Sequence, residues 1–205
     1  WTGQVGPFTT AGRGVAWNGT RFIAVGQGGN TIVTSTTGTS WSLTTNTPFL
    51  TAGYGVAWNG TQWVAVGSGG NTVAYSADGL QWTGLGTTTF TTAGNNAYFA
   101  NNLWIAVGQG GNTVASSSDG ITWRPVASGT AALTTSASGI TYDNNLWIAA
   151  GAGTHSIATS VDGSGSWIGR GNVLATGTAV VGGATYAVPT VTTPLYVAVG
   201  QTGNT

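Results

Sequence analysis

The phrase AVGQGGNT stands at residues 24–31 and returns unchanged at 106–113. Three variants follow the same pattern: AVGSGGNT at 65–72, AAGAGTHS at 149–156 and AVGQTGNT at 198–205. The first glycine of each phrase falls at Gly26, Gly67, Gly108, Gly151 and Gly200, in steps of 41, 41, 43 and 49 residues. A period of this length is typical of one blade of a propeller. The phrase therefore marks a structural repeat.

Each complete repeat contains four short segments with strand character. In the second copy they cover 54–60, 61–70, 71–79 and 80–86, where β-branched and aromatic residues alternate with small polar ones between Gly, Asn and Asp turn signals. No apolar period of 3.6 residues occurs, so essentially no helix is expected. The pattern predicts an all-β fold: a five-bladed β-propeller of four-stranded antiparallel blades with about 41 residues per repeat.

One domain, 1–205, accommodates all five repeats, at approximately 1–40, 41–81, 82–122, 123–166 and 167–205. Trp1 matches the start of a fourth strand, so we expect the N-terminal strand to complete the last blade. The fifth copy reaches Thr205 just before its third strand. We therefore expect either that the native chain continues or that a neighbouring subunit donates a strand.

Three aromatic columns recur through the repeats and are expected to fill the seams between blades. A fourth column of phenylalanines lies between the fourth strand and the next repeat, where packing against the adjoining blade is favoured over contact with a partner. The columns are Trp17, Trp58, Phe99, Tyr142 and Tyr186; Phe22, Trp63, Trp104, Trp147 and Tyr196; Trp1, Trp41, Trp82, Trp123 and Trp167; and Phe8, Phe49 and Phe90.

The turn between the first two strands is predicted from its asparagines. Asn18–Gly19 and Asn59–Gly60 suit a type I′ hairpin turn, whose two central residues both need positive φ. Repeats three and four carry Asn101–Asn102 and Asn144–Asn145 at the matching place. Asparagine tolerates positive φ better than most other residues.

The turn before the fourth strand reads STTGTSW (35–41), SADGLQW (76–82), SSDGITW (117–123) and SVDGSGSW (160–167). With these turns the chain resembles the Asp-box, or BNR-like, repeat propellers found in bacterial secreted and surface proteins and in virus proteins. The resemblance implies the propeller fold. It implies little about activity, because that family includes sialidases, a photosystem assembly factor and adhesive modules. We expect Asp78, Asp119 and Asp162 to be structural acceptors for turn amides.

Charge is scarce, which excludes several classes of partner. Only 4% of residues are charged, with four cationic and four acidic side chains and a net charge of zero. Binding of nucleic acid or of an anionic membrane surface needs clustered Lys or Arg, so neither is expected. No apolar run reaches about 18 residues, so no membrane insertion is expected. A near-neutral surface favours an extracellular, cell-surface or virion location within an assembly.

The inventory of reactive side chains does not support an enzyme. The chain has no Glu and no Cys, and His155 is its single histidine. A sialidase needs an arginine cluster and an acid/base carboxylate, and the scattered arginines do not recur at matched positions. The glycine phrase lacks the Lys-Ser/Thr of a phosphate loop. We expect no catalytic residues, no metal and no cofactor.

Any ligand would be expected on the face that carries the glycine phrases, which in such blades also carries the loops between repeats. Neutral amides and hydroxyls recurring there suit a glycan or a protein surface. The simpler alternative, in which Gly-Gly-Asn only makes the turn, is favoured for each residue taken singly, and for His155 a polar turn residue is likewise favoured. The candidate ligand residues are Gln27, Asn30, Ser68, Asn71, Gln109, Asn112, His155, Gln201 and Asn204.

The sequence thus favours a non-enzymatic structural or adhesive propeller module of an extracellular surface, appendage or virion, which self-associates or joins a larger assembly. The alternative is a soluble glycan-binding lectin or an assembly-factor propeller.

Overall fold

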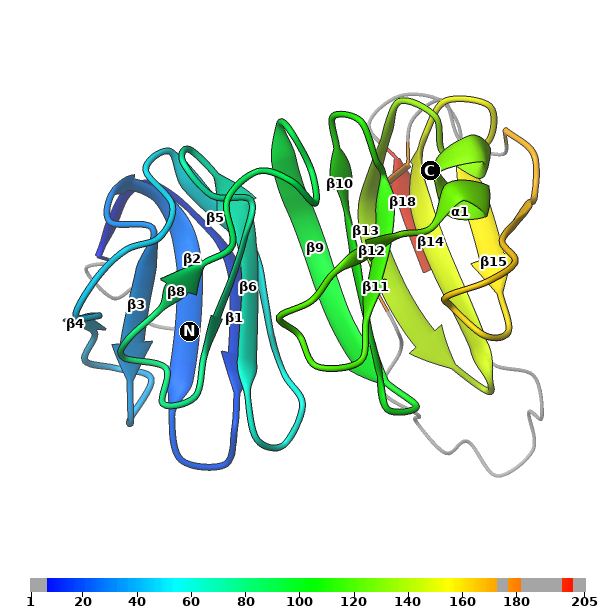
Figure 1. Ribbon diagram of the computed structural model, residues 1–205. Helices are drawn as coiled ribbons and strands as arrows, with labels where there is room; N and C mark the ends of the chain where they lie inside the picture. Colours follow the sequence, from blue (N-terminus) through cyan, green and yellow to red (C-terminus); the bar gives the residue numbers. More distant parts are fainter. Residues whose placement is uncertain (1–6, 173–176, 182–196, 201–205) are drawn as a thin grey trace.

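The structure is a computed structural model that describes residues 7–172, 177–181 and 197–200. Four successive antiparallel sheets, each with four strands in chain order, make up most of it (Figure 1). The first sheet holds β1 Phe8–Trp17, β2 Phe22–Gly29, β3 Ile32–Ser35 and β4 Ser42–Leu43; the second holds β5 Ala52–Trp58, β6 Trp63–Ser68, β7 Val73–Ser76 and β8 Thr83–Gly84. The third holds β9 Ala93–Ala100, β10 Leu103–Gln109, β11 Val114–Ser117 and β12 Arg124–Pro125; the fourth holds β13 Ser136–Asp143, β14 Leu146–Ala152, β15 Ile157–Ser160 and β16 Ile168–Gly169. One bridge, Gln27 to Ala52, joins the first two sheets.

A fifth strand pair belongs to the last repeat. β17 Gly177–Val181 pairs with β18 Val197–Gly200 in antiparallel register. The pair has the same register shift as the earlier first-and-second strand pairs, because Gly177 faces Gly200 and Ala179 faces Val199, just as Gly53 faces Gly67 and Gly55 faces Val66. The predicted third and fourth strands of this repeat, and the N-terminal strand at Trp1, lie outside the described residues.

The first strand of each sheet lies on the inside. β1 contacts β5, β5 contacts β9, β9 contacts β13 and β13 contacts β17, so these strands follow one another around a common axis. The fourth strands β4, β8, β12 and β16 are two residues long and form the outer edges. Short outer strands leave little unpaired backbone for edge-to-edge association. The arrangement is an all-β, propeller-like fold.

Neighbouring sheets pack face to face through the tryptophans of the second strands. Trp63, Trp104 and Trp147 are fully buried. Each contacts the sheet before it: Trp63 packs with Ile23 and Val25 of β2, and Trp147 with Ile105 of β10. Removing side chains of this size from water stabilises each seam by roughly 2–3 kcal/mol per ring. The aromatic columns are therefore core wherever a preceding sheet covers them.

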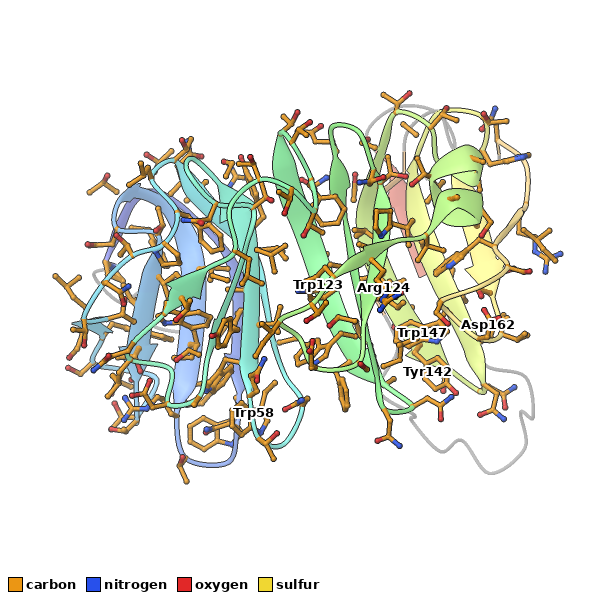
Figure 2. All side chains as sticks on the ribbon, in the orientation of Figure 1. Trp58, Trp123, Arg124, Tyr142, Trp147 and Asp162 are labelled. Carbon is orange, nitrogen blue, oxygen red and sulfur yellow. The ribbon has the colours of Figure 1, made fainter. Side chains whose placement is uncertain are left out.

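The other members of the columns differ in burial. Trp82 and Trp167 of the fourth-strand column are buried, whereas Trp17 of the first sheet is 44% exposed. Each first-strand ring lies against the second-strand ring of its own sheet, as Tyr142 does against Trp147 at 4.8 Å between centroids (Figure 2). Tyr186, Tyr196 and Trp1 lie outside the described residues.

The glycine phrase makes the turn between the second and third strands, which we call the glycine turn. The first glycine of the phrase has no side chain, which leaves room for a phenylalanine ring from the loop that precedes the same sheet. A Cβ on Gly67 would stand 2.7 Å from Phe49 Cγ, and one on Gly108 would stand 2.8 Å from Phe90 Cγ. Phe49 and Phe90 are buried, so the phenylalanine column packs inside the fold. Leu133, also fully buried, stands at the matching position of the fourth repeat.

The asparagine hairpins correct one prediction. Asn101, Asn102, Asn144 and Asn145 have positive φ, as a type I′ turn requires. For Asn18–Gly19 and Asn59–Gly60 the type I′ prediction is wrong. In each of these pairs the glycine has positive φ and the asparagine does not. The backbone bond from Asn18 N to Arg21 O makes Gly19 and Thr20 the central residues, the pattern of a type II′ turn. The asparagine instead accepts bonds from Thr20 N and Arg21 N at its Oδ1.

One short helix departs from the helix-free expectation. α1 Ala127–Ala132 lies in the loop after β12, which runs from 126 to 135 and is longer than the loops at 44–51 and 85–92. Its sequence, ASGTAA, is rich in alanine, the strongest helix former. A Cβ on Gly129 would stand 2.8 Å from Val114 Cβ, so the helix packs closely on β11. The extra length of the third repeat is thus absorbed without disturbing the sheets.

Candidate functional site

The Asp turns, which join the third and fourth strands, hold three of the chain's four acidic side chains. Asp119 Oδ1 accepts bonds from Thr122 N at 2.7 Å, Ile121 N at 2.8 Å and Ser117 Oγ at 2.8 Å. Ser117 Oγ in turn accepts a bond from Gly120 N at 2.9 Å. Asp78 and Asp162 each accept a bond from the matching serine and from following turn amides. The carboxylates tie the turn together.

These bonds lower the pKa of each carboxyl group. The backbone N–H groups of Thr122 and Ile121 lower the pKa of Asp119 from 3.8 to about 2. The pKa of Asp78 is lowered by the N–H groups of Gln81 and Leu80, and that of Asp162 by the N–H group of Gly165 and the Ser160 hydroxyl. A carboxylic acid with a lowered pKa is a poor proton donor at neutral pH. The side chains fit a structural role.

A pH dependence of stability follows from Asp119. Because its pKa is lower in the folded chain, the carboxylate stabilises the fold above about pH 4, and that contribution is lost as the pH falls toward 2. We expect the urea midpoint of the native chain to fall over this window, and that of Asp119→Asn to start lower and fall less steeply. Equal slopes for the two chains between pH 6 and pH 2 would contradict the structural role of Asp119.

The asparagines of the glycine turns are also occupied. Asn30 Nδ2 donates to Pro7 O at 2.9 Å, Asn71 Nδ2 to Pro48 O at 2.7 Å and Asn112 Nδ2 to Thr89 O at 3.1 Å. Asn71 Oδ1 also accepts a bond from Gly86 N at 2.8 Å. Each amide therefore fastens the glycine turn to the loop that precedes its sheet. This geometry favours the simpler alternative, in which these asparagines make the turn.

His155 takes the asparagine's place in the fourth sheet. Its backbone N donates to Ala132 O at 2.9 Å, and its Nδ1 accepts a bond from Gly171 N at 3.2 Å. The Nδ1 contact repeats that of Asn71 Oδ1 with Gly86 N, whereas the carbonyl that the asparagine side chains bind in the earlier turns is bound here by the backbone N. Among the residues that the structure describes, no three His, Asp, Cys or Glu side chains come together as metal ligands would. Gln201 and Asn204 lie outside the described residues.

Gln27, Ser68 and Gln109 occupy a different position, at the ends of the second strands, where all three are half-buried. They lie beside a column that the sequence reasoning missed. The first strands carry one extra residue at their register shift, and this bulge residue is Arg13 in β1, Tyr54 in β5, Asn95 in β9 and Ser138 in β13. The sequence did carry a signal for this column. The third residue of the tripeptides AGR (11–13), AGY (52–54), AGN (93–95) and SAS (136–138) varies between otherwise similar copies.

Arg13, Gln27, Tyr54 and Ser68 form one group, here called the mouth cluster. Arg13 Nη2 donates to Gln27 Oε1 at 2.8 Å, and the Arg13 guanidinium carbon lies 5.1 Å from the centroid of the Tyr54 ring. Ser68 Oγ lies 3.4 Å from Tyr54 Oη. The cluster joins the first two sheets at the glycine-turn end of the inner strands. Stacking on an aromatic ring and a hydrogen bond together hold the guanidinium in one place.

Asn95 makes a similar connection between later sheets, because its Nδ2 donates to Ala137 O at 2.8 Å. Bulge residues therefore reach from one inner strand toward the next. β-Bulges often re-aim side chains next to functional sites.

In the described residues, the one helix, α1, is too short to cross a membrane.

No family model matches the sequence, and no curated protein matches it. Solved structures do resemble the fold. The computationally designed protein Ika8 superposes with a TM-score of 0.61 at 14% identity, over 83% of this chain and 52% of its own. The extracellular domain of a one-component system from B. thetaiotaomicron has a TM-score of 0.60 at 8% identity, over 82% of this chain and 23% of its own.

YCF48, solved bound to D1 peptide, superposes with a TM-score of 0.54 at 12% identity, over 78% of this chain and 53% of its own. The chain thus spans about half the length of Ika8 and of YCF48. At these identities the likeness concerns the fold alone, which is all-β and propeller-like.

Proposed function

We propose that the chain is a five-bladed propeller of the Asp-box type. Four sheets with the same strand order support this proposal, as does a fifth strand pair with the same register shift. The bonds around Asp78, Asp119 and Asp162 are those expected when a carboxylate closes a turn of this kind. In the proposed domain the repeats follow the boundaries given above, and the N-terminal strand completes the last blade.

The proposed function is that of a non-enzymatic structural or adhesive module of an extracellular surface, appendage or virion. The observation that carries it is the engagement of the carboxylates: the three Asp-turn side chains are already hydrogen-bonded to turn amides, so they are poorly suited to general acid or base work. A chain in which 4% of the residues are charged and the net charge is zero supports association into larger assemblies.

Two measurements on the native chain test this function together. Light scattering over a range of concentrations should show particles larger than the 20.4 kDa monomer. A panel of glycosides, including sialosides, should show no hydrolysis above the buffer rate. Turnover that Asp119→Asn abolishes would overturn the non-enzymatic assignment. A monomer at every concentration, with no adhesion to any surface, would overturn the structural assignment.

The alternative is a soluble glycan-binding lectin or an assembly factor, and the mouth cluster is the observation that favours it. A fixed guanidinium beside amide and hydroxyl groups is a recognisable set of ligand donors. The two functions differ in particle size: a lectin should bind a sugar saturably as a discrete particle, whereas a structural module should occur in large assemblies.

A further inference from the structure

The positive charge of Arg13 is fixed in place but is not neutralised by the groups that fix it. Its hydrogen-bond partner, Gln27 Oε1, and its stacking partner, the Tyr54 ring, are both uncharged. A guanidinium carries five N–H donors, and the bond to Gln27 uses one of them. The side chain is exposed, so the remaining donors are available to a ligand.

The acidic side chains are committed elsewhere. Asp78, Asp119 and Asp162 lie in the Asp turns. Gln62, in the hairpin between β5 and β6, donates from Nε2 to Asp119 O. The Asp turns therefore lie at the same end of the sheets as the hairpins between first and second strands. Asp143 ends β13 in the corresponding hairpin. The mouth cluster lies toward the opposite end of the inner strands, beside the glycine turns. Among the described residues, no carboxylate is placed beside Arg13, which leaves its charge available to a ligand.

The residues around Arg13 narrow the chemistry of that ligand. Tyr54 and Ser68 offer hydroxyls, and the same positions in the next sheets carry Asn95 and Gln109. All four are half-buried and uncharged. One cation among several neutral donors and acceptors matches a molecule with one negative charge among many hydroxyls. A polyanion would leave most of its charges unpaired here, and an apolar ligand would leave these polar groups unsatisfied.

We propose that the mouth cluster binds an acidic saccharide, with the Arg13 guanidinium holding the carboxylate of a uronate residue and the neighbouring amides and hydroxyls receiving the sugar hydroxyls. The inference rests on the proposed adhesive function and names its ligand class. Tyr54 and Gln27 pre-organise the guanidinium, which lowers the entropic cost of binding. Fork-shaped pairing of guanidinium with carboxylate is stronger and more directional than a neutral hydrogen bond.

Calorimetric titration of the native chain with trisaccharides that carry a single galacturonate or glucuronate residue tests the inference, with maltotriose as the neutral probe. We expect saturable binding of at least one uronate, weakened by added salt, and no binding of maltotriose. Arg13→Gln should weaken the uronate affinity about tenfold or more, the usual effect of losing a hydrogen bond to a charged group. Arg13→Lys should recover part of it, because it keeps the charge but loses the stacked fork.

Arg124→Gln is the matched control. Arg124 is also exposed, but it lies on the outer strand β12 (Figure 2), so its loss should leave the affinity unchanged. Thermal melts of each variant identify any loss that comes from misfolding, and Tyr54→Phe, which keeps the ring under Arg13, serves as a second test with a smaller expected loss.

Three outcomes would overturn the inference. Equal binding of maltotriose, unaffected by Arg13→Gln, would show recognition of a neutral glycan. Binding of a peptide with a free carboxylate but of no uronate would show a different occupant. No binding of any probe, in a chain that still assembles or adheres, would remove the site and leave the proposed function standing. A chain that neither assembles nor adheres but binds uronate would instead remove the structural function.

Discussion

Replacing Trp104 by alanine should lower the free energy of unfolding by about 3–5 kcal/mol. Trp104 is fully buried in the seam between the second and third sheets, where it packs with Val64, Val66 and Val73. The substitution removes a fully buried indole ring from that seam and leaves a cavity that rigid strands cannot close. Because domains of this size are stable by about 5–15 kcal/mol in total, the loss is a large share.

Urea unfolding followed by circular dichroism measures this loss. Trp17→Ala is the matched control, since Trp17 belongs to the first sheet and is 44% exposed. We expect its midpoint to shift much less than that of Trp104→Ala. Equal shifts would mean that the tryptophans do not form the seams between sheets.

The second large effect is expected at a glycine of the repeated phrase. Gly108→Ala should destabilise the chain by about 1–3 kcal/mol, although alanine adds only one methyl group. The new Cβ would stand 2.8 Å from Phe90 Cγ, and Phe90 is fully buried, so the ring or the strand must shift. The effect arises from close packing, because the φ of Gly108 is not positive.

Gly12→Ala is the control for this prediction. A Cβ on Gly12 would meet its nearest atom, Phe8 Cδ2, at 3.7 Å, an ordinary contact distance. Thermal melting should therefore separate the two variants clearly. If Gly108→Ala melts with the native chain, the glycine is not required by the phenylalanine packing.

The repeat and its four strands could be predicted from the sequence because both rest on local signals. Period-2 alternation with Gly and Asn turns gave strands at 54–60, 61–70, 71–79 and 80–86, and the structure has β5 to β8 within or close to these ranges. The hairpin turns were misplaced by one residue in the first two repeats. When the first and third repeats are aligned on Trp17 and Phe99, and not on their asparagines, Gly19 matches Asn101 and the error is corrected.

The candidate site was harder to predict because it depends on pairing between distant strands. The sequence indicates that Asn30, Asn71 and Asn112 are polar and recur, but not that each amide donates to a carbonyl 23 residues earlier. Likewise, Arg13 and Tyr54 are ordinary polar and aromatic positions until the register shift places one over the other. Turn-forming residues and ligand-binding residues share a composition, and only the bonding distinguishes them.

Three positions of the repeated phrase have a physical explanation. Its glycine admits the phenylalanine ring, its asparagine fastens the preceding loop, and Thr31 and Thr72 donate from Oγ1 to the carbonyls of Phe49 and Phe90 in the following loop at 2.8 and 2.9 Å. These contacts join each sheet to the loops on both sides. Repetition of the phrase therefore follows from architecture, and ligand chemistry is left to the variable bulge residues beside it.

The most direct test of this division is a crystal structure of the native chain with a trisaccharide that carries one galacturonate residue. It should place a uronate carboxylate within hydrogen-bonding distance of the Arg13 guanidinium, with Asp78, Asp119 and Asp162 still bonded to their turn amides. A saccharide bound at the Asp turns, or at the backbone amides of the glycine turns, would contradict the account.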